Sequence, residues 1–437
     1  MGRDIKPVFR CIQCHRIYDI DEALYHCPHC GDLLDVVQDL EGLKEIVSRE
    51  IFEERLGRIH PPYNSGVWRF KELIHPTVED RLLVTKAYRG VSEGNTPLYK
   101  DPRIAEYAGV KNLILKHEGE NPSGSFKDYG MAVGVTEARR QGAKRVACAS
   151  TGNTSSSLAM YAAIAGLECI VMIPKGAVAS GKLAQTLAYG AKIFEVEGNF
   201  DDALELVVKC TEELGFYLLN SINPWRIEGQ KAMMYNLVLQ LGWTIPDWVV
   251  FPGGNLGNAS AFGKAFKELE ELGLIDGKPR LAIIQAEGAD PLYKTWKEEA
   301  EDRIDVEKPE TIASAIRIGR PVSWKKALRS LEWCGGVVEE VSDQEIMDAK
   351  ALIDRCGIGC EPASAASLAG LKKLVEGGVI DPGERIACIL TGNLLKDVKS
   401  TMDYHSSRIP GLTPRYRNTP VTVKPSVEDV KEHLNIL

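Results

Sequence analysis

A lysine in a turn rich in proline, glycine and serine is the first residue whose surroundings indicate chemistry. Residues 121–128 read NPSGSFKD and place Lys127 where a helical segment is expected to begin. The positive end of a helix dipole favours the neutral form of a nearby amine, and Schiff-base chemistry requires a neutral amine. Taken alone, such a stretch more often carries a solvated surface lysine.

A second candidate lies at the junction of an expected strand and helix. Residues 149–155 read ASTGNTS, so small hydroxyl side chains surround a glycine. Backbone N–H groups at the start of a helix form a natural anion site, although simple capping by Ser or Thr is the alternative. The amide of Asn153 could meet a ring hydroxyl or a carboxylate.

Two further glycine turns follow expected strands. Residues 251–258 read FPGGNLGN, where glycines let the backbone approach a ligand and consecutive N–H groups can hold phosphate. The run is neither a P-loop nor a dinucleotide fingerprint, and a plain glycine turn is the alternative. Residues 389–393 read ILTGN, and the hydroxyl of Thr391 could face a ring nitrogen. Together the four motifs fit pyridoxal 5'-phosphate, which needs an amine, a phosphate cradle and partners for its ring oxygen and nitrogen.

The elements that must position these motifs alternate between short β-rich runs and longer amphipathic stretches. Such alternation predicts βαβ units and a parallel sheet, hence an α/β fold. Expected strands are 145–149, 168–173, 192–196, 216–219, 248–251 and 281–285, and expected helices are 155–166, 182–189, 201–214 and 259–272. The last 35 residues, rich in Pro, Arg and Thr, are expected to form an arm.

Composition narrows the class of protein. The chain has 437 residues, of which 44% are apolar and 26% charged, as in ordinary globular proteins of two or three domains. A net charge of -8 argues against nucleic-acid binding. No apolar run approaches the roughly 20 residues of a membrane span, and no signal peptide is evident, so a cytoplasmic location is expected.

Four of the eleven cysteines stand within the first thirty residues. Cys11 and Cys14 form one Cys-x2-Cys knuckle, and Cys27 and Cys30 form another. This spacing is typical of a structural zinc ribbon with four thiolate ligands. Plain free thiols, or a ribbon that has lost its metal, are the alternatives, and the nearby histidines are interpreted as bystanders.

The motifs together resemble those of the threonine synthase family, of the fold type II pyridoxal-phosphate enzymes. The similarity extends from residues 92–98 (SEGNTPL) to about Asp397 and includes residues 220–230 (NSINPWRIEGQ). It implies a tryptophan synthase β-like fold of two α/β domains. The expected division is a ribbon at 1–40, a large domain at 41–129 and 221–437, and a small domain at 130–220.

The resemblance also implies roles for individual residues. Lys127 forms the Schiff base and moves protons, Asn153 contacts the ring oxygen, and Thr391 meets the ring nitrogen. The full set expected around the cofactor is Phe126, Lys127, Asn153, Gly253, Gly254, Asn255, Leu256, Gly257, Asn258 and Thr391. The set expected around the substrate's phosphate and carboxylate is Ser150, Thr151, Thr154, Asn220, Ser221 and Arg226.

The implied activity is conversion of O-phospho-L-homoserine and water to L-threonine and phosphate, by an enzyme expected to be a homodimer. Two departures from the family pattern leave the exact reaction open, because Tyr129 replaces an arginine and residues 393–398 read NLLKDV. A cysteate synthase-like replacement on O-phosphoserine is one alternative. A non-enzymatic zinc-ribbon binding module is another, disfavoured because no basic stripe with aromatics accompanies the ribbon.

Overall fold

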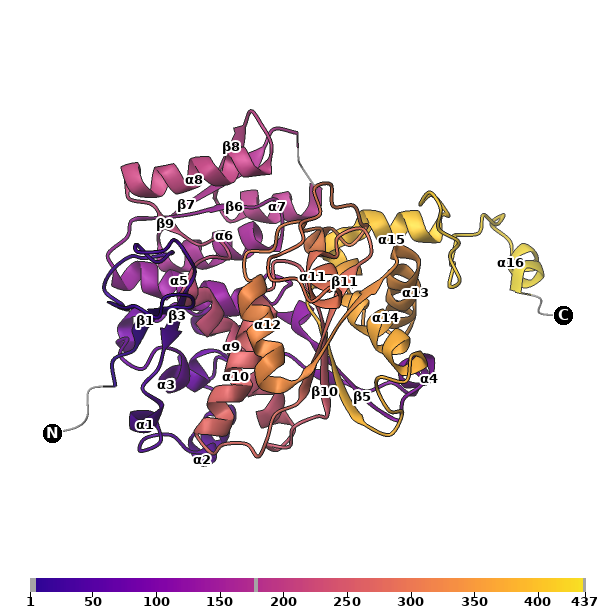
Figure 1. The fold of residues 1–437 in the computed structure, drawn as a ribbon. Coiled ribbons are helices and arrows are strands. Elements are labelled where there is room, and N and C mark those ends of the chain that lie inside the picture. Colours follow the sequence, from indigo (N-terminus) through magenta and orange to yellow (C-terminus); the bar gives the residue numbers. More distant parts are fainter. Residues whose placement is uncertain (1–4, 177–179, 435–437) are drawn as a thin grey trace.

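A computed structural model describes residues 5–176 and 180–434 of the chain (Figure 1). Three separate sheets organise it: a three-stranded antiparallel sheet, a four-stranded parallel sheet and a six-stranded mixed sheet. The α/β fold class expected from the sequence is confirmed. Within the described residues, no helix is both long and apolar enough to cross a membrane.

The N-terminal sheet is the ribbon that carries the cysteine knuckles. Its strands, in the order β2-β1-β3, are β1 (Val8–Cys11), β2 (Ile17–Asp19) and β3 (Leu34–Val37). The lead-in that follows contains three helices and three short 3-10 turns. These are α1 (Leu40–Leu43), α2 (Arg49–Leu56), η1 (Trp68–Phe70), α3 (Lys71–Ile74), η2 (Asp80–Leu82) and η3 (Lys86–Arg89).

The four-stranded sheet has the order β8-β7-β6-β9, and every pairing in it is parallel. Its strands are β6 (Arg145–Ala149), β7 (Glu168–Pro174), β8 (Lys192–Val196) and β9 (Tyr217–Leu218). With α6 (Asn153–Ala165), α7 (Ser180–Ala188) and α8 (Phe200–Leu214), this sheet forms what we call the small lobe. The helix α5 (Lys127–Arg140) packs between α6 and the large sheet's helix α9 (Pro224–Gln240).

The six-stranded sheet has the order β12-β11-β10-β13-β5-β4, and only the short β4 pairs antiparallel. Its strands are β4 (Leu98–Tyr99), β5 (Asn112–His117), β10 (Trp248–Pro252), β11 (Arg280–Ala286), β12 (Gly336–Val341) and β13 (Arg385–Leu390). We call this sheet and its helices the large lobe. Besides α9, these are α4 (Pro102–Ala108), η4 (Glu118–Glu120), α10 (Gly257–Glu271), α11 (Pro291–Lys297), η5 (Ser314–Ile316), α12 (Trp324–Cys334), α13 (Asp343–Arg355), α14 (Pro362–Glu376), η6 (Leu394–Asp397) and α15 (Val398–His405).

Alternation along β10 shows how helices cover both faces of the large sheet. Val249 and Phe251 pack in the core that includes α9, α10 and α12, whereas Trp248 and Val250 pack in the core that includes α4, α13 and α14. Burial on both faces is the usual arrangement of a parallel sheet. The expected division into domains, with boundaries at 129/130 and 220/221, remains a prediction.

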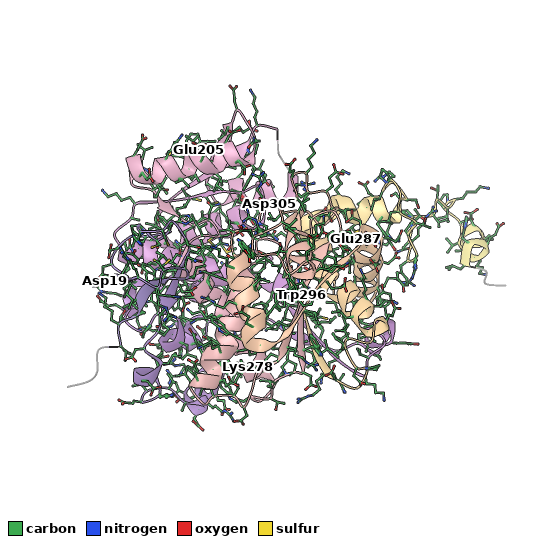
Figure 2. The ribbon with its side chains drawn as sticks, in the orientation of Figure 1. Asp19, Glu205, Lys278, Glu287, Trp296 and Asp305 are labelled. Carbon is green, nitrogen blue, oxygen red and sulfur yellow. The ribbon has the colours of Figure 1, made fainter. Side chains whose placement is uncertain are left out.

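The chain ends in an arm that leaves the body beyond α15 and carries α16 (Val427–Leu434) away from it (Figure 1). Charged side chains such as Asp19 and Glu205 lie at the outer surface (Figure 2). Because the net charge of the chain is -8, any phosphate site must depend on local donors.

Candidate active site

The lysine turn and the threonine turn, far apart in sequence, lie side by side. The Phe126 N–H donates to the Thr391 carbonyl at 3.0 Å, and the Asn393 N–H donates to the Gly124 carbonyl at 2.9 Å. Ser125 and Gly392 form a β-bridge between these two bonds. The cause is topological: β5 and β13 are parallel neighbours, so the loops beyond their carboxyl ends meet at one edge of the sheet.

Lys127 is the first residue of α5, as the sequence predicted. Burial, followed by the positive charge of Arg226, lowers the pKa of Lys127 to about 7. The Lys127 Nζ lies 4.1 Å from the centre of the Phe126 ring. An amine with this pKa is half neutral near physiological pH and is therefore a competent nucleophile and proton acceptor.

The loop beyond β6 places Asn153 at the start of α6. The Asn153 Nδ2 donates to Glu361 at 2.9 Å, while its Oδ1 is buried without a hydrogen-bond partner among the described residues. The Ser150 hydroxyl accepts from the Gly152 N–H at 3.2 Å. Thr151, in the same loop, and Thr154, in the first turn of α6, are partly buried. The amide of Asn153 therefore has a buried acceptor atom, at the start of a helix, that is available to a ligand.

The glycine turn joins β10 to α10, a 15-residue helix whose first residue is Gly257. Leu256 has a φ of 65°, a left-handed conformation that is uncommon for a residue with a side chain and often occurs at ligand sites. A Cβ on Gly254 would lie 3.1 Å from the Ala315 carbonyl oxygen, so the backbone here is closely packed. A Cβ on Gly253 would lie 2.6 Å from Ile283.

The asparagines of this turn differ in what their side chains do. Asn255 donates to the Ser221 hydroxyl at 3.0 Å and accepts from the Val322 N–H at 2.8 Å. Asn258 keeps a buried Oδ1 without a partner in the described part of the chain. Asn255 thus ties the expected phosphate cradle to the segment expected to bind substrate.

The segment expected to bind substrate contains an amide, Asn220, that holds a neighbouring loop, and a buried guanidinium, Arg226. Both polar atoms of the Asn220 amide are bonded at 3.0 Å to the backbone of Ala149, so this side chain fixes the loop that contains Ser150. Arg226 is 1% exposed, and one of its nitrogens donates to the Leu219 carbonyl at 3.0 Å. Across residues 5–176 and 180–434, no carboxylate forms an ion pair with Arg226, and its Nε has no partner.

Burial lowers the pKa of Arg226 to about 10, which still leaves the guanidinium positively charged at neutral pH. A buried cation without a counter-ion is costly unless a bound anion neutralises it. The arrangement therefore favours an anionic ligand beside Lys127.

Two departures from the family pattern are placed by the structure. Tyr129 is fully buried, and its hydroxyl donates to the Gly94 carbonyl at 3.3 Å, so it packs against the 92–98 segment. The second departure, in the run 393–398, begins at Asn393, whose amide oxygen accepts from the Leu395 N–H at 3.0 Å. Lys396, which this run shares with the family pattern, donates to Ser156 at 3.0 Å and to Gln185 at 2.5 Å. Lys396 thus joins the large lobe to α6 and α7.

The sequence interpretation missed Glu361 and Lys182, which lie in the same cluster. Glu361 precedes α14, and Lys182 in α7 forms an ion pair with it at 3.3 Å. The available signal was a single acidic residue in a run of small residues, at 359–367 (GCEPASAAS). A buried carboxylate in such a run requires a partner, although the sequence does not reveal which.

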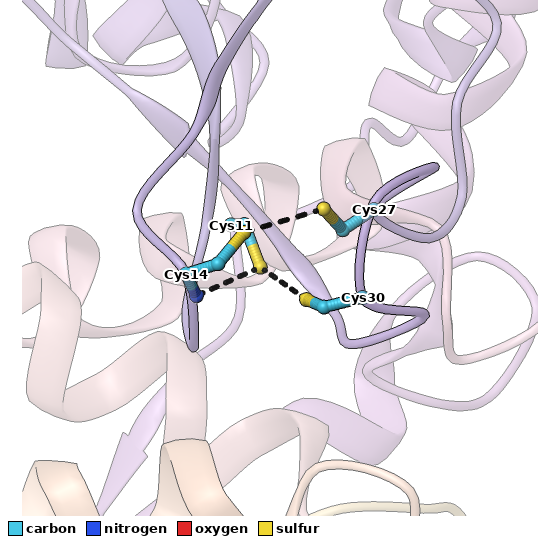
Figure 3. A group of neighbouring side chains, drawn as sticks. All are labelled: Cys11, Cys14, Cys27 and Cys30. Atoms are coloured by element: carbon cyan, nitrogen blue, oxygen red, sulfur yellow. Dashed lines mark hydrogen bonds between the residues drawn. The ribbon is translucent and has the colours of Figure 1, made fainter.

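The four ribbon cysteines form a separate cluster (Figure 3). Their sulfur atoms all lie within 4.8 Å of one another, with 3.4 Å between Cys11 and Cys30 and 3.6 Å between Cys14 and Cys27. This convergence of the two knuckles could hold a metal ion in a closed four-thiolate site.

The residues beside Lys127 fit pyridoxal 5'-phosphate. Besides the amine, the site offers the buried Oδ1 atoms of Asn153 and Asn258, which have no partner among the described residues. It also offers a closely packed glycine turn at a helix N-terminus. Thr391 is buried beside the lysine loop, where its carbonyl accepts from the Phe126 N–H, and its hydroxyl lies 3.2 Å from that of Ser364. Each group the cofactor requires is therefore present.

Comparison with known proteins defines the class. A family model described as "Pyridoxal-phosphate dependent enzyme" matches residues 91–392, and the chain belongs to this family. The structure of maize serine racemase matches with a TM-score of 0.62 at 22% identity, covering 78% of this chain and 97% of that one. The fold is that of the type II pyridoxal-phosphate enzymes, as expected.

Relatives with similar sequences give a more specific comparison than the family model. The chain is similar to threonine synthase of Methanocaldococcus jannaschii, at 50% identity over 89% of this chain and 92% of the relative. It is similar to chloroplastic threonine synthase 2 of Arabidopsis thaliana, at 40% identity over 95% of this chain and 82% of the relative. The family resemblance inferred from the motifs is thereby confirmed.

Proposed function

We propose that this protein converts O-phospho-L-homoserine and water to L-threonine and phosphate. The relatives named above support the reaction, and one structural observation supports an anionic substrate. Arg226 is a buried guanidinium without a carboxylate partner in the described chain, next to the Lys127 amine. Its planar fork of donors suits a phosphate or carboxylate.

Lys127, Asn153, Thr391 and the turn at 253–258 would hold pyridoxal 5'-phosphate. When bound, the cofactor supplies an aldehyde for the substrate's amine and a conjugated ring that accepts electron density from the α-carbon. The helix N-terminus at Gly257 would face its phosphate. Thr391 carries no charge and therefore cannot supply the full negative charge that an aspartate would place at a ring nitrogen.

Lys127 is the proton-transfer group of the proposed reaction. Because its pKa is about 7, the freed amine can accept the α-proton and later return a proton, both without a large energetic penalty. In the overall reaction the bond between the γ-carbon and the phosphate oxygen breaks and the γ-carbon gains a proton. The β-carbon loses a proton and bonds to the oxygen of water, whose second proton leaves with the phosphate. The charge of Arg226 would stabilise the departing phosphate.

The substrate's anionic groups would be recognised by residues from both lobes. Ser221 precedes α9 and Arg226 lies within it, while Ser150 and Thr151 come from the loop beyond β6 and Thr154 from the first turn of α6. Asn220 acts on this group by holding the Ala149 backbone. Closure of the two lobes would exclude water until the addition step.

Turnover of two phosphorylated amino acids tests the proposal. The purified protein should release phosphate and form threonine from O-phospho-L-homoserine, and it should show no product from O-phosphoserine with sulfite. Arg226→Lys keeps a charge but loses the fork, so kcat/KM should fall by about 10- to 150-fold. Product formed only from O-phosphoserine and sulfite would replace this proposal with a cysteate synthase-like one.

We also propose that the four cysteines hold a structural zinc ion. The convergence of four thiolates from two knuckles supports zinc, and such a closed site leaves no open position for catalysis. The homodimer, the absence of nucleic-acid binding and the cytoplasmic location remain predictions from the sequence.

A further inference from the structure

Glu361 is a buried carboxylate at the point where several parts of the site meet. Its side chain is 2% exposed, and it stands immediately before α14 in the large lobe. It accepts from the Asn153 Nδ2 at 2.9 Å and pairs with the Lys182 Nζ at 3.3 Å. Both partners belong to the small lobe, on α6 and α7.

The backbone of Glu361 is fixed to the threonine turn. Its N–H donates to the Gly392 carbonyl at 3.0 Å, and its side chain packs directly over Gly392. A Cβ added to Gly392 would lie 2.2 Å from the Glu361 Oε1, a separation that real atoms do not allow. Gly392 is therefore required by the close approach of this carboxylate.

We infer that Glu361 is a positioning residue that orients the Asn153 amide and Lys182 across the boundary between the lobes. It would thereby fix two of the groups that surround the cofactor bound to Lys127. The carboxylate accepts from the Nδ2 of Asn153, which leaves the Oδ1 as the atom without a partner. The inference rests on the proposed function, because it takes the site to hold pyridoxal 5'-phosphate on Lys127.

Charge around Lys127 agrees with this role. Burial is the main cause that lowers the pKa of Lys127; the cations of Arg226 and Lys182 lower it further, and the Glu361 carboxylate raises it. The negative charge of Glu361 thus partly offsets the positive charges of Arg226 and Lys182, which disfavour a proton on the Lys127 nitrogen. Loss of the carboxylate should make that proton easier to remove.

The test compares Glu361→Gln with Glu268→Gln, a matched removal of another buried carboxylate. Glu268, in α10, pairs with Lys231 of α9 and with Lys264, and within the described residues none of its hydrogen bonds or ion pairs reaches a residue of the site. In Glu361→Gln, the affinity of the apoprotein for pyridoxal phosphate should fall about tenfold or more, the effect of losing a charged hydrogen-bond partner. The pH midpoint of the bound cofactor's absorbance should move downward, and Glu268→Gln should change neither quantity.

A double-mutant cycle separates positioning from general destabilisation. If Glu361 acts through Lys182, the effects of Glu361→Gln and Lys182→Met on cofactor affinity should be clearly less than additive. Unchanged affinity and midpoint in Glu361→Gln would overturn the inference, and so would additive effects or equal losses in Glu268→Gln. These measurements of cofactor affinity and absorbance need no substrate. A wild-type protein that fails to turn over O-phospho-L-homoserine would therefore refute the proposed function, while the same measurements would still test the role of Glu361.

Discussion

At the scale of single residues, the site depends on controlling charge around one amine. Lys127 lies near two cations and one buried carboxylate, and these together with burial set its proton affinity. The sequence indicated Lys127, Asn153 and Thr391, because each lies in a turn with a recognisable chemical pattern. It did not indicate Glu361, whose partners are about 180 to 210 residues away and become neighbours only when the lobes meet.

The lowered pKa of Lys127 predicts an unusual pH profile for its reactivity. An amine is nucleophilic only when neutral, so its reactivity rises with pH until its pKa is passed. In cofactor-free protein, acylation of Lys127 should rise through a pH of about 7 and then level off. An ordinary exposed lysine should continue to gain reactivity up to about pH 10.4. Competitive labelling with mass spectrometry of the Lys127 peptide measures this, and a midpoint near that of an exposed lysine would contradict the electrostatic description.

At the scale of elements, the strand-to-helix turns place the functional groups. Parallel strands bring the loops after β6, β10 and β13 to the carboxyl ends of two sheets, where the cofactor is expected. The expected strands at 145–149 and 192–196 agree with β6 and β8 in both bounds, because short β-rich runs between glycine-containing turns are distinctive. The helix α9 was not foreseen, since it is buried almost all round and shows no amphipathic stripe.

Gly254→Ala tests the glycine turn between β10 and α10. The new Cβ would lie 3.1 Å from the Ala315 carbonyl and 3.2 Å from the Ile316 Cα, and backbone atoms cannot easily give way. We expect a cost of about 1–3 kcal/mol, seen as roughly tenfold or greater weakening of cofactor binding. Gly57→Ala is the control, because the nearest atom to its Cβ is 3.8 Å away. Equal cofactor dissociation constants for the two variants would argue against a cradle at this turn.

At the scale of the whole molecule, the ribbon contacts both lobes. On the large lobe, Asp35 pairs with Lys326 at 2.9 Å and with Arg329 at 2.7 Å, both in α12. On the small lobe, the Tyr25 hydroxyl accepts from the Leu218 N–H at 2.8 Å. The spacing of the cysteines predicted their convergence, but it could not predict these contacts, which depend on residues outside the ribbon.

Metal analysis tests the ribbon as a structural unit. The purified protein should contain about one zinc ion per chain, and Cys11→Ser should lose it, because a four-thiolate site needs all its ligands. That variant should show a lower Tm and faster proteolysis within residues 1–40, while Cys210→Ser, outside the cluster, should behave as wild type. Full metal content in Cys11→Ser would exclude the proposed ligand set.

The central claim is that the amine of Lys127 carries the cofactor, and trapping that bond tests it most directly. Borohydride reduction of the protein with bound cofactor should abolish the absorbance at about 410 nm and attach one pyridoxyl group covalently to each chain. Peptide mapping should then find the group on Lys127. Recovery of the label on another lysine, such as the neighbouring Lys182 or Lys396, would contradict the account.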